Sequence, residues 1–123
     1  MVEPGILLLP QKEDITMKGK KYDSGKLRWS LVPWKAMRVV VRVLMYGADK
    51  YEPDNWLKVD QWERRYLNAA MRHQISILSG DGVYDKESGL HHWAHAICCL
   101  LFALERFINE YEERSREWKS RNT

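Results

Sequence analysis

The chain has 123 residues, of which 45% are hydrophobic and 30% are charged. Six Trp, six Tyr and two Phe exclude a disordered polymer, and seven Gly and two Cys are too few for a collagen-like or disulfide-stapled protein. The net charge of +3, with both signs interspersed, gives no reason to expect duplex nucleic acid as a partner. We therefore expect a single domain over residues 1–123.

No segment has the length and hydrophobicity of a membrane span. The longest apolar run, Ala96–Leu104, falls far short of the roughly 20 residues that a bilayer requires. Cys98 and Cys99 are adjacent within this run, and we interpret both as buried thiols of a reducing compartment. The sequence thus predicts a cytoplasmic protein without a membrane partner.

Residues 1–20 have no periodic pattern and are interpreted as an irregular arm. Pro33 suits the first turn of a helix, and apolar residues recur at helical spacing after it. The pattern predicts a helix over Pro33–Asp49. Its expected buried face consists of Ala36, Val39, Val40, Val43 and Leu44.

Tyr51–Val59 is expected to be a loop, because it contains Pro, Asp and Asn. Asp60 followed by Glu63 matches a capping box, which predicts a second helix from that point to about Leu78. Its expected apolar side consists of Leu67, Ala70, Met71, Ile75 and Leu78.

A third helix is predicted from about Leu90 to beyond Glu117, with Ser88 as its N-cap. Residues 105–123 form a charged extension of it, whereas Ala96–Leu104 is apolar on every side and needs neighbours all round. Three helices of one chain barely supply those neighbours. We expect an all-α fold in which three main helices form a bundle completed by homo-oligomerisation.

Four short segments contain residue types that bind anions or nucleotides. The first, Lys21–Arg28, combines glycine with cations, as phosphate sites do, and could equally be a solvated linker. The second, Tyr46–Tyr51 with Asn55 and Trp56, could stack a base and bond its edge, or anchor loops to the core.

The third segment lies on the second helix, where Arg65, Asn68 and Arg72 share a stripe near His73. Such stripes are usually solvated or paired. The fourth segment, Asp85–His95, places His91, His92 and His95 at the start of the third helix, where histidines at i, i+3 or i, i+4 could bind a metal or a phosphate. Which of these three histidines acts stays open.

The order of these motifs resembles a bacteriophage family named for a dATP/dGTP diphosphohydrolase N-terminal domain, related to the all-α nucleotide pyrophosphohydrolases of the MazG type. The resemblance covers about Lys21 to Leu104. The matching residues are Lys21-x-Asp23-x-Gly25-Lys26-x-Arg28, Tyr46-Gly47-Ala48-x-Lys50-Tyr51 with Asn55-Trp56, Arg65-Tyr66-Leu67 with Arg72-His73, and Asp85-x-Glu87-Ser88-Gly89-Leu90-x-His92-x-x-His95-Ala96.

The resemblance implies a phage-encoded nucleotide-binding homo-oligomer in the host cytoplasm that hydrolyses purine (deoxy)nucleoside triphosphates at a phosphoanhydride bond. Asp85 and Glu87 would hold Mg²⁺ or Mn²⁺ and, with His92, carry the catalysis, since His73, His92 or His95 would position water. The nucleotide would be bound through phosphate contacts, base stacking and hydrogen bonds by Asp23, Lys26, Arg28, Lys50, Tyr51, Asn55, Trp56, Arg65, Tyr66, Arg72, His73 and His95.

Two other functions stay open from the residues. The wider group holds its metal with an E-E-x-x-E…E-x-x-D pattern, but 33–48 contains no acidic residue. Cations, aromatics and histidines without a carboxylate cluster also suit a sponge that needs no cofactor and sequesters a cyclic or signalling nucleotide to counter host defence. The third possibility is a helical interaction protein that uses its charged extension.

Overall fold

The computed structural model describes residues 19–122. Contacts between residues divide the chain into two units, Met1–Pro33 and Trp34–Thr123. The described part of the first unit is exposed except for Val32, and its one helical turn is the 3-10 helix η1 (Trp29–Leu31). Most of the arm expected over residues 1–20 lies outside the described residues.

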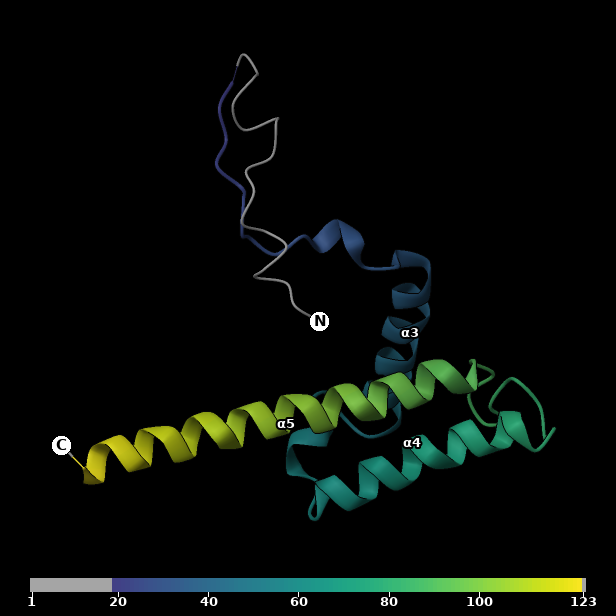
Figure 1. The fold of residues 1–123 in the computed structure, drawn as a ribbon. Helices are drawn as coiled ribbons and strands as arrows, with labels where there is room; N and C mark the ends of the chain where they lie inside the picture. The colour runs from purple at the N-terminus through teal and green to yellow at the C-terminus, as the bar shows by residue number, and fades with distance from the viewer. Residues whose placement is uncertain (1–18, 123) are drawn as a thin grey trace. The chain divides into compact units, whose positions relative to one another are not determined.

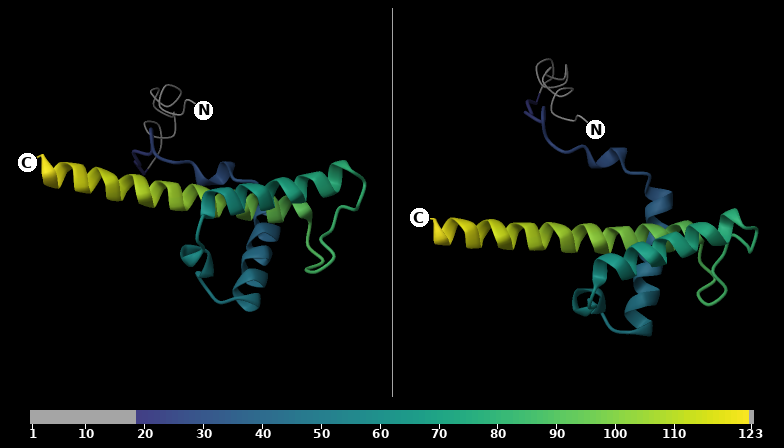
Figure 2. Two further views of the ribbon diagram at one scale, coloured as in Figure 1. Left: turned by 90° about the horizontal axis from the view of Figure 1, so that it is seen from below. Right: turned by 60° about the horizontal axis from the view of Figure 1, so that its bottom comes forward.

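The second unit is built from helices. They are α3 (Trp34–Lys50), the 3-10 helix η2 (Asn55–Lys58), α4 (Trp62–Leu78) and α5 (His92–Arg121). Figures 1 and 2 show α4 and α5 side by side and running in opposite directions, with α3 crossing α5 steeply. Residues 19–122 contain no strand, only one isolated bridge between Tyr84 and His91. The all-α class with three main helices is therefore confirmed.

The buried core lies where α3 crosses the first half of α5. Val40 and Val43 of α3 pack against Ala94 and Cys98 of α5. The small side chains on α5 allow the two helices to approach closely. The Cys98 thiol also donates a hydrogen bond to the carbonyl of Val40, at 3.4 Å. The crossing fixes the C-terminal end of α3 beside α5, where the candidate site lies.

Adjacent valines on α3 provide a matched test of this core. Val40 is 1% exposed, whereas Val41 is 47% exposed. We expect Val40→Ala to lower the free energy of unfolding by about 2 kcal/mol, since it removes buried methyl groups and leaves a cavity. Val41→Ala should change it by about 0.5 kcal/mol or less. Urea unfolding of the two variants measures the difference, and equal losses would contradict this core.

Both predicted N-caps are wrong. α4 begins at Trp62 after Gln61, whose φ of 51° is left-handed and which makes no side-chain cap, so the Asp60 capping box does not form. α5 is capped by His91, whose Nδ1 accepts a hydrogen bond from the Trp93 N–H at 2.9 Å. In both cases the helix begins later than the sequence signal. Arg106 holds the Val59 carbonyl ahead of α4. Ahead of α5, the His92 N–H donates to the Val83 carbonyl and the Asp85 N–H to the Leu90 carbonyl, so the chain stays in a loop up to His91.

The expected apolar side of α4 is largely exposed. Ala70 is buried, but Leu67, Met71, Ile75 and Leu78 are between 48% and 83% exposed. Likewise Cys99 is only half-buried, against the expectation of two buried thiols. The reason is that the described helices cover α4 and α5 on one side only.

No helix among residues 19–122 is long and apolar enough to cross a membrane.

Candidate functional site

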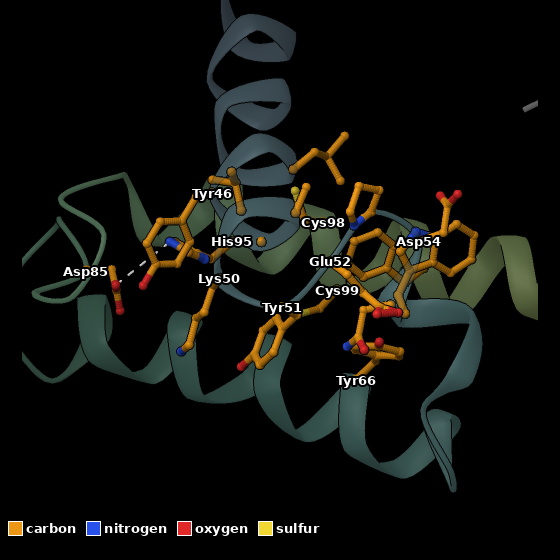
Figure 3. A pocket seen from close by; sticks show the side chains of 18 of the residues that line it. Tyr46, Lys50, Tyr51, Glu52, Asp54, Tyr66, Asp85, His95, Cys98 and Cys99 are labelled. Carbon is orange, nitrogen blue, oxygen red and sulfur yellow. Dashed lines mark ion pairs between the residues drawn. The ribbon is translucent and has the colours of Figure 1, made fainter.

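A cavity of about 490 Å³ lies between the end of α3, the loop with η2, and the facing sides of α4 and α5 (Figure 3). This volume is within the range of small-molecule sites. In Figure 3, Asp85 and Tyr46 lie at one end and Tyr66 at the other. The lining includes Tyr46, Lys50, Tyr51, Asn55, Trp56, Tyr66, His73, Asp85, Glu87, His95, Cys98, Cys99 and Phe102.

One end of the cavity is aromatic. Trp56 stacks on Phe102 with ring centroids 4.9 Å apart and planes within 12°, and Tyr66 meets Phe102 at 5.4 Å. Arg106 of α5 donates hydrogen bonds to the carbonyls of Trp56 and Val59, at 3.0 and 2.9 Å. These bonds hold η2 on α5, so the indole is fixed in place for a ligand to stack against.

The other end contains a group of imidazoles and one carboxylate, here called the histidine cluster: His73, Asp85, His92 and His95. The Nδ1 atoms of His73 and His92 are 2.8 Å apart, and the rings of His73 and His95 stack at 4.6 Å. Asp85 Oδ2 lies 3.9 Å from His95 Nε2. Ligand atoms of His73, Asp85 and His92 all lie within 4.8 Å of one another.

The loop between α4 and α5 positions the Asp85 carboxylate beside the three imidazoles of this cluster. The Asp85 N–H donates to the Leu90 carbonyl at 2.8 Å, and the Gly89 N–H donates to the Asp85 carbonyl at 2.7 Å. Gly89 has φ of +74°, a conformation that side chains disfavour. Asp85 Oδ2 accepts the Ser88 N–H at 2.8 Å. The sequence D-x-x-S-G thus closes a tight turn that fixes the carboxylate.

A second polar group borders the histidine cluster. Glu87 accepts hydrogen bonds from Lys50, at 2.7 Å, and from Tyr46. The hydrogen bond between Lys50 and Glu87 raises the pKa of Lys50 and lowers the pKa of Glu87. The hydrogen bond to Glu87 likewise raises the pKa of Tyr46. The pair is exposed and therefore weak. An anionic ligand could replace Glu87 as the partner of the Lys50 ammonium.

The protonation states at the cluster suit metal binding or proton transfer. Burial lowers the pKa of His73 and of His95, so both imidazoles are neutral at pH 7. Burial alone would raise the pKa of Asp85, but hydrogen bonds from Ser88 outweigh it and lower the pKa. An ionised carboxylate therefore faces neutral imidazoles, which are the forms that bind metals or accept a proton.

Two nucleophilic mechanisms fit the site poorly. Burial raises the pKa of Cys98 to about 12 and also raises that of Cys99, so these thiols are protonated and unreactive at neutral pH. Ser88 Oγ lies 2.7 Å from His95 Nε2, the same ring nitrogen that faces Asp85. A serine relay needs the hydroxyl and the acid on opposite ring nitrogens.

A family model described as dATP/dGTP diphosphohydrolase, N-terminal, matches residues 16–116. The chain belongs to this family. A protein of Salmonella phage PMBT28 named dATP/dGTP diphosphohydrolase is 36% identical over 106 residues, which cover 85% of this chain and 35% of that protein. The chain therefore spans about a third of the length of that relative. No solved structure matches.

Most of the residues predicted for the site come together in the structure. Nine line the cavity, namely Lys50, Tyr51, Asn55, Trp56, Tyr66, His73, Asp85, Glu87 and His95. His92 does not line the cavity but is buried against His73, which does. Arg65 and Arg72 are exposed on α4 and do not line it. Asp23, Lys26 and Arg28 belong to the first unit, whereas the cavity is built from the second.

Sequence reasoning missed four residues that contribute to the site. Tyr46 and Ser88 stood in the quoted motifs, so their hydrogen-bonding side chains could have been counted. Phe102 lies in an apolar run and Arg106 in a charged one, and nothing in the sequence separates them from their neighbours. Only the packing of η2 on α5 reveals their roles.

The lowered histidine pKa values predict how stability depends on pH. Below about pH 6.5 these histidines become protonated in the unfolded chain, whereas in the folded protein His73 and His95 stay neutral to lower pH. The unfolded state then binds more protons, so the free energy of unfolding should fall as the pH falls from 6.5 through the lowered values. The negative charge of Asp85 raises the pKa of both histidines and so opposes the lowering, whereas positive charge on His92, and on Arg72 beside His73, adds to it.

Circular dichroism melts with a chelator present, between pH 7.5 and 5, measure this dependence. A variant with both His73→Gln and His95→Gln should lose less melting temperature over the same interval. The same dependence in the two proteins would show that other groups cause it.

Proposed function

We propose that the chain binds a purine deoxynucleoside triphosphate in the cavity and hydrolyses one of its phosphoanhydride bonds. The observation that carries the proposal is the division of one cavity into an aromatic end and an end with a cation, imidazoles and a carboxylate. A nucleotide has the same division between base and phosphates. The name of the phage relative supports the choice of dATP or dGTP as substrate.

The aromatic end suits a base and the polar end suits phosphates. Trp56 and Tyr66 offer ring faces at this end. Stacking on such a face is open to any base and strong enough to orient a nucleotide. Asn55 lines the same end and could bond the base edge. Lys50, about 39% exposed in its side chain, reaches the other end and could exchange Glu87 for a phosphate.

Hydrolysis adds water across a P–O–P bridge. The water oxygen bonds to the α-phosphorus, the bond from that phosphorus to the bridging oxygen breaks so that pyrophosphate leaves, and a base must accept the proton of the water. His95 suits this role because its imidazole is neutral and held by Ser88 beside Asp85. A divalent cation would neutralise the phosphate charge, and Asp85 is the carboxylate placed to help hold it.

Incubation with each of the four deoxynucleoside triphosphates and Mn²⁺, followed by chromatography, tests the proposal. We expect catalytic formation of monophosphate from dATP or dGTP. Nucleotide that disappears stoichiometrically and returns intact after denaturation would establish sequestration instead, for which the comparisons give no support. An absence of both binding and turnover would contradict a nucleotide site.

We also propose that the chain acts as a homo-oligomer. A groove between α4 and α5 is lined by Trp62, Glu63, Leu67, Leu100, Ala103, Leu104 and Phe107. It continues into the exposed stripe of α4, and so much exposed apolar surface is unusual in a monomer. Light scattering should give a multimeric mass that Leu104→Glu reduces and Val41→Glu on α3 does not; a monomeric wild type would refute the proposal.

A further inference from the structure

The geometry points to a transition-metal site formed by His73, Asp85 and His92. We propose that it binds an ion such as Mn²⁺, Co²⁺ or Zn²⁺ in preference to Mg²⁺. The site borders the cavity of the proposed function, but the inference does not depend on that function, because metal binding can be measured without a nucleotide.

The first observation is the approach of two imidazoles. His73 Nδ1 and His92 Nδ1 lie 2.8 Å apart, so in the free protein one of these nitrogens donates its N–H to the lone pair of the other. Two nitrogens bonded to one ion at about 2.1 Å lie about 3 to 3.5 Å apart. When that N–H proton moves through exchange with water to the Nε2 atom of the same ring, both Nδ1 lone pairs are free, and a cation can bind between them after only a small separation of the rings.

The second observation is the fixed carboxylate. Asp85 has an oxygen within 4.8 Å of the ligand nitrogens of both histidines. Its Oδ2 atom accepts the Ser88 N–H, an outer contact of the kind that orients metal-binding carboxylates. His73 comes from α4, His92 from the first residue of α5 and Asp85 from the connecting loop. An ion would thus cross-link three parts of the second unit.

The donor set does not fit Mg²⁺. This ion prefers an octahedron of oxygens, whereas two imidazoles and one carboxylate favour later divalent metals. Glu87, the other carboxylate of the loop, is already held by Lys50 and Tyr46. It does not belong to the group whose ligand atoms converge among the described residues. Three protein ligands leave positions on the ion for water or a ligand in the cavity.

Titration of the metal-free full chain with Co²⁺ and, separately, with Mg²⁺, followed by calorimetry and by visible absorption of bound Co²⁺, tests the site. We expect one Co²⁺ per chain and Mg²⁺ binding weaker by about 100-fold or more. His73→Gln and Asp85→Asn should each weaken Co²⁺ binding by about tenfold or more. Thermal melts establish whether each variant is folded. If His73→Gln is not folded, Asp85→Asn alone tests the site.

The matched control is His91→Asn. His91 is adjacent to His92 but caps α5, and Asn is a good capping residue, so this variant should bind Co²⁺ as the wild type does. The site is refuted if Co²⁺ does not bind saturably, if Mg²⁺ binds within tenfold of it, if the folded ligand variants bind normally, or if His91→Asn is equally impaired. Bound Co²⁺ without nucleotide turnover would contradict the proposed function alone.

Discussion

Replacing Asp85 by asparagine is expected to reduce nucleotide hydrolysis by about 100-fold or more, because a charged group beside the reacting phosphate is worth that much in a shielded site. Asp85 is the carboxylate of the histidine cluster, and Ser88 lowers its pKa so that it is ionised. Asparagine keeps an oxygen that can accept the Ser88 N–H, so the turn that carries residue 85 should survive. Nucleotide binding should weaken much less than turnover.

Asp81→Asn is the matched control. Asp81 is an exposed acid in the same connection between α4 and α5, and it does not line the cavity. Steady-state kinetics with dATP and dGTP should give wild-type kcat for Asp81→Asn and a strongly reduced kcat for Asp85→Asn. If the two variants had the same kcat, Asp85 would have no part in the reaction.

The helices could be predicted from the sequence because their signals are local. Apolar residues at helical spacing predicted α3 to within one residue at each end. Val40 and Val43 of its expected buried face are buried, whereas Ala36 of the same face is exposed. The ends of α4 and α5 were less predictable. Gln61 and His91 are the N-caps of these helices, and the hydrogen bonds that hold the preceding loops, from Arg106 to the Val59 carbonyl and from the His92 N–H to the Val83 carbonyl, leave no local sequence pattern.

The residue types of the site could also be predicted, but not their grouping. His92 and His95 were recognised from their spacing on one helix, whereas His73 lies on another helix and joins them only through the packing of α4 on α5. Asp85 and Glu87 looked equivalent in the sequence. The turn at Gly89 separates them, so that Asp85 faces the histidines and Glu87 faces Lys50.

Replacing Trp56 by alanine is expected to weaken nucleotide binding by roughly 5- to 150-fold, the equivalent of about 1 to 3 kcal/mol for loss of one stacking face. Trp56 lies on Phe102 at one face, and Arg106 holds its backbone carbonyl. The backbone contact does not need the side chain, so η2 should keep its place while the ring is lost. The substitution should therefore weaken the binding of the base and leave the binding of the phosphates unchanged.

Inorganic triphosphate, which has no base, separates the two parts of the ligand. Calorimetry in the Asp85→Asn background avoids turnover, and in it Trp56→Ala should weaken dATP binding while leaving triphosphate binding within about twofold. Trp118→Ala, at an exposed tryptophan near the end of α5, is the control and should bind both ligands normally. If Trp56→Ala weakened triphosphate as much as dATP, the aromatic end would be needed for the shape of the cavity and would not be the base site.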